Sequence, residues 1–175
     1  MNFTNTNLLI SGNSHKEFAK LLADHLNTNL CSAEVSKFNN GEIKVNINQS
    51  IRKKDCFVIQ PTSSGGNNSP NDNLMEIFIL IDALKRGSAN SVTIIMPYYG
   101  YERQDRKDYS RAPISATVVS KCLEALGANR VIVYDLHAGQ IQGFFSNKVP
   151  LDHLYIEPYF INYIKEYILN NHSLD

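Results

Sequence analysis

Short runs of apolar residues alternate with longer amphipathic runs through most of this chain. The short runs are rich in valine, isoleucine and leucine, and they predict strands at residues 8–11, 30–38, 42–46, 56–60, 92–96 and 131–135. Between them, apolar residues at helical spacing predict helices at residues 15–26, 73–86, 113–127 and 158–169. This alternation of strands and helices indicates an α/β fold of three layers, in which a mainly parallel sheet is flanked by helices.

Turn and capping residues predict where several of these elements begin and end. Asn73 and Glu76 have the spacing of a capping box, so we expect the second helix to begin there. Gly87 follows two cations and is expected at the C′ position of that helix, and Pro113 is expected to be the first residue of the third helix. Residues 39–41, Asn-Asn-Gly, favour a tight turn and predict a short β-hairpin flap.

Composition limits the classes of protein to which the chain can belong. Its 175 residues suit one domain, and equal numbers of basic and acidic residues, 17 of each, give no net field to attract nucleic acid or a membrane surface. No apolar run has the length of a membrane span, and residues 1–7 lack the pattern of a signal peptide. Cys31, Cys56 and Cys122 show no metal-binding spacing, so we expect reduced core cysteines and a cytoplasmic location.

Polar segments follow four of the predicted strands. They comprise residues 11–15, 60–66, 98–113 and 135–140. The carboxyl ends of parallel strands lie at one edge of a sheet, and ligands bind beyond that edge, so these loops are predicted to converge on one site. The chain contains no P-loop motif, and the absence of Gly-x-Gly-x-x-Gly argues against an ordinary dinucleotide fold.

The loop at residues 98–113 carries the densest mixture of cations, carboxylates and tyrosines. Guanidinium groups suit phosphate oxygens, and aromatic faces suit a base. Arg103, Gln104, Asp108 and Arg111 therefore have the chemistry to orient a polyphosphate and its base. The alternative is a solvated loop tied together by its own weak salt bridges.

Two smaller groups of residues also have functional and structural interpretations. Asp135 and His137 lie two residues apart at a strand end, a spacing that can present both side chains to a metal ion such as Mg²⁺. The alternative is that Asp135 caps the next turn while His137 bonds to the backbone. Phe38, Asn40 and Glu42 form a turn that projects an aromatic and two polar groups, or else a purely structural hairpin.

Four long motifs resemble those of ribose-phosphate diphosphokinase, also called phosphoribosyl pyrophosphate synthetase. They are residues 71–76, 101–107, 110–116 and 135–145, and the resemblance extends from residue 9 to residue 167. It implies a phosphoribosyltransferase-like fold, with residues 1–170 as the N-terminal, ATP-binding half of the enzyme. The ribose 5-phosphate domain would then be absent from this chain.

The resemblance also implies roles for individual residues. ATP would be held by Phe38, Asn40 and Glu42 from a neighbouring subunit and by Arg103, Gln104, Asp108 and His137. Magnesium, the implied cofactor, would be placed by Asp135 and His137. The family assembles into dimers and hexamers, so a homo-oligomer is expected. The intact enzyme transfers the β,γ-diphosphoryl group of ATP to ribose 5-phosphate, a reaction that depends on cations and metal more than on a covalent nucleophile.

The chain departs from the family pattern in several respects. Residues 146–148, Ser-Asn-Lys, replace an acidic position, and Asp152 would take the next acidic place near the metal. The family's acidic glycine-rich loop for ribose 5-phosphate and its mobile Lys/Arg loop do not occur here. We therefore expect little turnover by this chain alone. The alternative hypothesis is a non-catalytic subunit that binds and regulates a full-length synthetase.

Overall fold

A computed structural model describes residues 6–64 and 68–169 of the chain. Residues 65–67, part of the predicted polar loop, lie outside the described residues, as do residues 1–5 and 170–175. The centre of the fold is a parallel sheet of five strands in the order β1-β4-β5-β6-β7. Its strands are β1 (Asn7–Ser11), β4 (Asp55–Ile59), β5 (Ser91–Met96), β6 (Arg130–Tyr134) and β7 (Leu151–Leu154).

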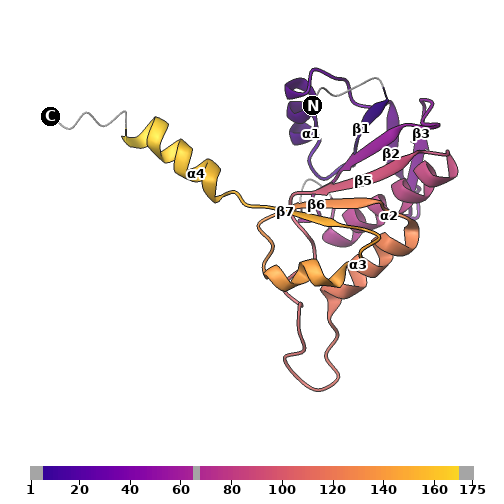
Figure 1. Ribbon diagram of the computed structural model, residues 1–175. Coiled ribbons are helices and arrows are strands. Elements are labelled where there is room, and N and C mark those ends of the chain that lie inside the picture. The colour runs from indigo at the N-terminus through magenta and orange to yellow at the C-terminus, as the bar shows by residue number, and fades with distance from the viewer. Residues whose placement is uncertain (1–5, 65–67, 170–175) are drawn as a thin grey trace.

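Helices lie on both faces of this sheet, which confirms the predicted three layers (Figure 1). On one face, Ala19 and Ala23 of α1 (Lys16–His25) are buried against Leu9 and Ile59. The opposite face is covered by α2 (Pro70–Arg86) and α3 (Ser115–Leu126). The predicted second helix is apolar on its inner face, where Ile77, Leu80, Ile81 and Leu84 are fully buried, whereas Met75 is 47% exposed.

The predicted flap is a separate antiparallel hairpin of β2 (Ala33–Lys37) and β3 (Ile43–Ile47). Gly41 in its turn has φ +92°, a conformation that side chains with a Cβ rarely adopt. The Phe38 N–H donates to the Glu42 carbonyl oxygen at 2.8 Å and closes the hairpin. Val45 and Ile47 pack against the same core as α2, so the base of the flap is anchored while its tip projects into solvent.

The start of α2 differs from the sequence prediction. The helix is capped by Ser69, Pro70 occupies the first turn, and Asp72 completes a capping box by accepting the Ser69 N–H at 2.9 Å. Asn73 and Glu76 were predicted to form that box because they have the same spacing, but both lie fully buried inside the helix. The capping residues therefore lie one turn earlier than predicted, and the side chains of Asn73 and Glu76 are not used in the cap.

Two further helix boundaries were wrong in detail. Gly87 ends α2 with φ −75°, and the left-handed residue is Ser88, at φ +63°. Gly87 is needed for close packing instead, because an added Cβ would lie 2.3 Å from Cδ1 of Ile51. Pro113 precedes α3, which begins at Ser115.

The C-terminal part of the chain contains elements that the sequence pattern did not predict. After β6, a 3₁₀ helix η1 (Gly139–Phe144) leads to β7. The predicted last helix is present as α4 (Glu157–Tyr163), continued by the π-helix η2 (Ile164–Leu169), and it extends away from the body (Figure 1). Among the helices of the described residues, none is long and apolar enough to cross a bilayer.

Candidate functional site

The loops that follow the parallel strands are joined to one another at the carboxyl edge of the sheet. The Gly12 N–H donates to the carbonyl oxygen of Ile59 at 3.0 Å, which joins the ends of β1 and β4. The Gly100 N–H donates to Thr62 Oγ1 at 2.6 Å, which joins the loops after β4 and β5. An added Cβ at Gly100 would lie 2.9 Å from that same oxygen, so glycine permits this approach. These bonds confirm that the loops after β1, β4 and β5 lie at one edge of the sheet.

The loop between β5 and α3 projects beyond this edge as a long arm (Figure 1). Its base is fixed by Tyr99, which is fully buried and donates its hydroxyl hydrogen to the Ala116 carbonyl oxygen at 3.0 Å. Burial raises the pKa of the Tyr99 hydroxyl far above its usual range, so this tyrosine stays a neutral donor. Its ring packs edge-on against Phe145. Tyr99 is therefore a structural residue and is unavailable to stack on a ligand.

Two buried carboxylates join this loop to the one after β6. Glu102 and Asp105 are only 7% and 8% exposed. Oε2 of Glu102 accepts the backbone N–H of His137 at 2.8 Å, and Oδ2 of Asp105 accepts from Nε2 of Gln140 at 2.5 Å. Sequence reasoning missed both residues, because nothing in the sequence distinguishes them from the exposed charges of the same loop. The two loops are therefore held together at two points.

Arg103 and Gln104 lie in one pocket at this edge. The pocket has a volume of about 650 Å³, and its walls include Thr62 and Ser63 from the loop after β4 and Tyr98 from the loop after β5. Both Arg103 and Gln104 are exposed, and Gln104 Oε1 accepts from the hydroxyl of Ser115. The structure thus brings together a guanidinium, an amide and several hydroxyl groups, a set suited to a phosphorylated ligand.

Asp108 and Arg111 lie on the exposed arm of the same loop, outside the lining of this pocket. Asp108 Oδ1 pairs with Nε of Arg106 at 3.1 Å, and this pair raises the pKa of the Arg106 guanidinium. The arm therefore contains an internal salt bridge of the kind expected for a solvated loop without a ligand-binding role. Arg111 adopts φ +66°, in the left-handed region.

The three candidate metal ligands are not gathered into one cluster. The Asp135 carboxylate accepts the Ile156 N–H at 3.2 Å, so it bonds to the segment after β7 and not to the next turn, and the His137 side chain is exposed. Asp152, on β7, forms a bidentate ion pair with Arg130 at 2.6 and 2.8 Å. Within residues 6–64 and 68–169, no three His, Cys, Asp or Glu side chains are grouped as metal ligands.

His153 orients the beginning of the loop that carries His137. Its Nε2 accepts the Leu136 N–H at 3.0 Å, so the proton of the neutral ring lies on Nδ1. The ring centroids of His153 and Tyr155 lie 4.2 Å apart, with the two ring planes tilted by 38°. Sequence reasoning assigned no role to this histidine because β7 itself was not predicted.

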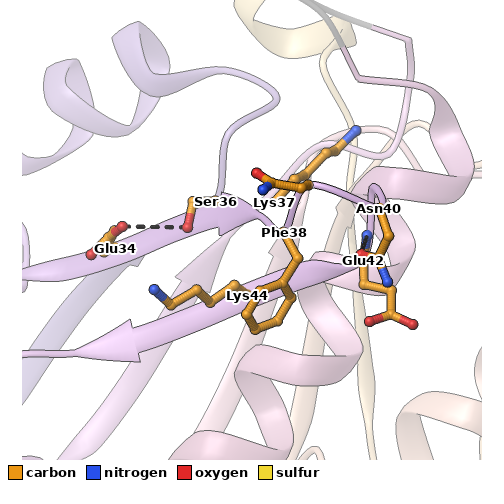
Figure 2. A pocket seen from close by; sticks show the side chains of 8 residues that line it. Glu34, Ser36, Lys37, Phe38, Asn40, Glu42 and Lys44 are labelled. Atoms are coloured by element: carbon orange, nitrogen blue, oxygen red, sulfur yellow. Dashed lines mark hydrogen bonds between the residues drawn. The ribbon is translucent and has the colours of Figure 1, made fainter.

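The tip of the hairpin forms a second, shallow pocket of about 710 Å³ (Figure 2). Phe38 is 52% exposed, and Nζ of Lys44 lies 5.9 Å from the centroid of its ring. Asn40 Oδ1 accepts the Glu42 N–H at 3.2 Å. Phe38, Asn40 and Glu42 are thus brought together, and they line a pocket separate from the one that contains Arg103.

The fold and this site define a class of protein: an α/β protein with the phosphoribosyltransferase-like arrangement, whose ligand pocket lies beyond the carboxyl ends of parallel strands. A model of the N-terminal domain of ribose phosphate pyrophosphokinase matches residues 7–127. The chain therefore belongs to the ribose phosphate pyrophosphokinase family, and the part of it that matches is the N-terminal domain.

Individual relatives agree with this assignment. The chain is 50% identical over 160 residues to ribose-phosphate pyrophosphokinase A of Dictyostelium discoideum, a match that covers 91% of this chain and 49% of that protein. It is 48% identical to the ribose-phosphate pyrophosphokinase of Thermotoga maritima, with the same coverage of 91% and 49%. The crystal structure of phosphoribosylpyrophosphate synthetase from Mycobacterium smegmatis superposes with a TM-score of 0.84 at 40% identity, covering 94% of this chain and 53% of that one. The chain spans about half the length of the curated relatives it matches.

Proposed function

We propose that this chain is the ATP-binding half of a ribose-phosphate diphosphokinase. The intact enzyme would transfer the β,γ-diphosphoryl group of ATP to the 1-hydroxyl of ribose 5-phosphate. The observation that carries the proposal is the hydrogen bond from the His137 N–H to Glu102. Glu102 directly precedes Arg103, so this bond holds the loop of Arg103 against the loop of His137. Two motifs that are 34 residues apart, at 103 and 137, would thereby serve the same ligand site.

Each residue in the pocket has a role that follows from its chemistry. The exposed guanidinium of Arg103 would bind phosphate oxygens of ATP, and the amide of Gln104 would hydrogen-bond the nucleotide. Asp108 would reach the nucleotide from the arm of the loop, and His137 would contact the phosphates or their metal ion. Phosphoryl transfer spreads negative charge over several oxygens, so positioned cations and N–H groups are the catalytic contribution expected from this chain.

Magnesium is proposed as the cofactor, and the residues present fit an ion that arrives with the nucleotide. Mg²⁺ keeps several waters and uses one or two protein carboxylates together with substrate phosphates, so it does not require a protein cage of three ligands. Asp135 and His137, at the end of β6, would hold such an ion or its waters. Asp152 fits less well because its carboxylate is engaged by Arg130. When bound, the ion would neutralise charge on the transferred phosphates.

The hairpin tip supports a second part of the proposal, that the adenine is contacted by another subunit. Phe38, Asn40 and Glu42 lie on an exposed tip, and the pocket they line is open to solvent (Figure 2). An exposed aromatic ring beside two polar side chains suits a purine presented by a neighbouring molecule. The proposal therefore includes a homo-oligomer in which each hairpin completes the site of its neighbour.

Titration of the chain with magnesium-ATP tests this function. Arg103→Ala removes a charged group that donates to phosphate and is expected to weaken binding by about 10-fold or more. Arg52→Ala is the matched control, because Arg52 is an exposed arginine ahead of β4, at the opposite edge of the sheet, and its loss should leave affinity unchanged.

The outcomes of this titration separate the two hypotheses. Equal affinity of Arg103→Ala and the unaltered chain would overturn the proposed nucleotide site. Copurification with a full-length synthetase in the absence of any ATP binding would instead favour the non-catalytic regulatory subunit.

A further inference from the structure

Glu76 is a fully buried carboxylate in the middle of α2. It accepts four hydrogen bonds, two from Asn13 and one each from Gln60 and Asn68, at distances of 2.6–2.9 Å. Every donor is a neutral amide, and among the described residues no cation forms a salt bridge with this carboxylate. A buried anion of this kind is tolerated only when its hydrogen bonds are complete, so the surrounding geometry is tightly specified.

The three donating side chains use both hydrogens of their amide groups. Nδ2 of Asn13 also donates to the Val35 carbonyl oxygen at 2.9 Å. Nε2 of Gln60 and Nδ2 of Asn68 also donate to Oδ1 of Asn73, at 3.2 and 3.1 Å. Because Glu76 can only accept, the orientation of each amide is fixed, and none can flip without losing two hydrogen bonds.

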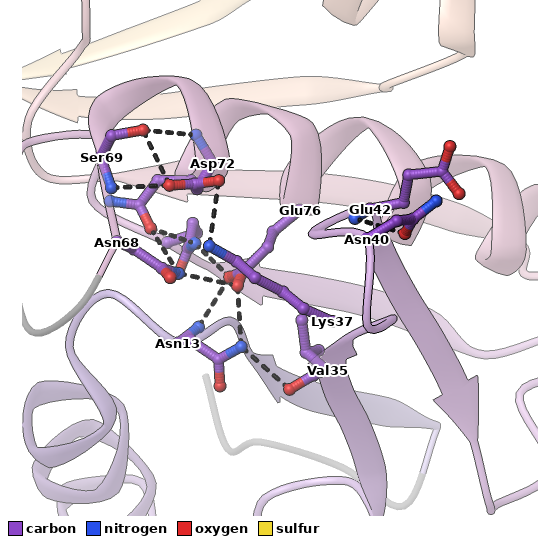
Figure 3. Close-up of polar contacts among 11 residues, drawn as sticks. Asn13, Val35, Lys37, Asn40, Glu42, Asn68, Ser69, Asp72 and Glu76 are labelled. Carbon is purple, nitrogen blue, oxygen red and sulfur yellow. Dashed lines mark hydrogen bonds and ion pairs between the residues drawn. The ribbon is translucent and has the colours of Figure 1, made fainter.

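These bonds connect α2 to both parts of the proposed site. Toward the hairpin, Asn13 holds Val35 in β2, three residues before Phe38 (Figure 3). Toward the pocket of Arg103, Nδ2 of Asn73 donates to the Ser63 carbonyl oxygen at 2.7 Å, and Ser63 lines that pocket. The hairpin and the pocket wall therefore share one anchor, the carboxylate of Glu76.

A second contact between hairpin and helix is weaker. Nζ of Lys37 pairs with Oδ1 of Asp72 at 3.1 Å, also visible in Figure 3, but both side chains are about one-third exposed. Ion pairs exposed to this degree contribute little to stability, so the part-buried bond from Asn13 to Val35 is the stronger restraint on the hairpin.

We propose that Glu76 is a positioning residue that fixes the orientation of the hairpin and of the loop after β4 relative to each other. Its carboxylate orients Asn13, which holds β2, and orients Asn68 and Gln60, which together hold Asn73 and through it Ser63. The consequence for nucleotide binding rests on the proposed function, whereas the coupling of the two segments does not.

Hydrogen exchange of backbone amides, measured on the 175-residue chain without ligand, tests the coupling. In Glu76→Gln, an amide group replaces one acceptor oxygen and faces two N–H donors. Exchange of the amides in β2, β3 and residues 62–64 is expected to accelerate about tenfold, while β5 and β6 stay as slow as in the unaltered chain.

Two variants separate the connection of Glu76 to the hairpin from its connection to the loop after β4, and they serve as controls for each other. Asn13→Ala removes the bond to Val35 and leaves those of Asn68, so only the hairpin should exchange faster. Asn68→Ala removes the bonds to Asn73 and Glu76, so only residues 62–64 should exchange faster. This pair carries the test even if Glu76→Gln fails to fold.

Two results would overturn the proposal. One is equal acceleration throughout the sheet, including β5 and β6, which would make Glu76 a general contributor to stability. The other is unchanged exchange in the hairpin of both Glu76→Gln and Asn13→Ala. Magnesium-ATP titration of the same variants is expected to show weaker binding by Glu76→Gln. If the unaltered chain binds no ATP, the proposed function fails while the exchange pattern still decides the coupling.

Discussion

The carboxylate of Glu102 accepts the backbone N–H of His137 at 2.8 Å, across 35 positions of sequence. The acceptor is 7% exposed, so the bond is shielded from water. It joins the loop after β5, which carries the guanidinium proposed for phosphate, to the loop after β6, which carries the histidine proposed for phosphate or metal. The relative position of the two loops therefore depends on a residue that need not touch the ligand.

Glu102→Ala is predicted to uncouple these loops. The variant removes the carboxylate that accepts the His137 N–H, and a hydrogen bond to a charged group contributes about 1.5–3 kcal/mol. The free energy of unfolding in urea should fall by that amount, and affinity for magnesium-ATP should fall as the loop of His137 moves. Glu102→Gln is the matched control, because its amide oxygen can still accept the bond. Loss of affinity in Glu102→Gln as large as in Glu102→Ala would contradict this account.

The capping box at the start of α2 predicts a specific dependence of stability on pH. Asp72 accepts hydrogen bonds from the Ser69 backbone and hydroxyl and pairs with Lys37, and these contacts lower the pKa of Asp72 from 3.8 to about 2. Because the pKa is lower in the folded than in the unfolded chain, the stabilisation is fully present above about pH 4 and is lost as the pH falls toward 2. The melting temperature of Asp72→Asn should lie below that of the unaltered chain at pH 5–8, and the two should converge by about pH 2. A constant difference across that range would exclude the carboxylate as the source.

Much of the fold was predictable because strands and helices obey different periodicities. The long stripe of α2 and the β-branched runs of β4, β5 and β6 were all found from the sequence. The strand β7, Leu-Asp-His-Leu, was missed because half of its residues are polar and it has no β-branched residue. Its pairing with β6 is set by the tertiary structure.

The site was predictable as a set of loops but not as a set of contacts. Strand order alone places the loops of Arg103 and His137 at one edge, whereas the sequence does not reveal that Glu102 joins them. Asn73 and Glu76 illustrate the same limit. Their spacing fits a helix cap, but Ser69 and Asp72 have that spacing too, and only burial distinguishes the two pairs. The hydrogen-bond partners of a buried polar residue lie far away in sequence, so its role cannot be inferred from local spacing.

The contrasting environments of Asp135 and Asp152 predict different effects on magnesium. Asp135→Asn keeps an oxygen for the Ile156 N–H and removes only the charge, so magnesium-dependent binding of ATP should weaken severalfold. Asp152→Asn breaks a half-exposed ion pair with Arg130, so ATP affinity should stay within twofold of the unaltered chain and stability should fall by about 0–1 kcal/mol. Titrations at several magnesium concentrations make the comparison. An equal effect of the two substitutions would identify Asp152 as a ligand of the ion.

Gly12 is predicted to tolerate no side chain, because the loop after β1 passes directly over Gln60. An added Cβ would lie 2.2 Å from Oε1 of Gln60, and Gln60 is fully buried and held by Ser14, Asn73 and Glu76, so it cannot move aside. Gly12→Ala should therefore destabilise the chain by about 1–3 kcal/mol, the usual cost of overpacking, measured by denaturation in urea. Gly143→Ala is the matched control, since nothing lies within 4 Å of its added Cβ, and its stability should stay close to that of the unaltered chain. If the two alanine variants were equally stable, Gln60 would have another position available, and the tightly specified geometry inferred around Glu76 would be wrong.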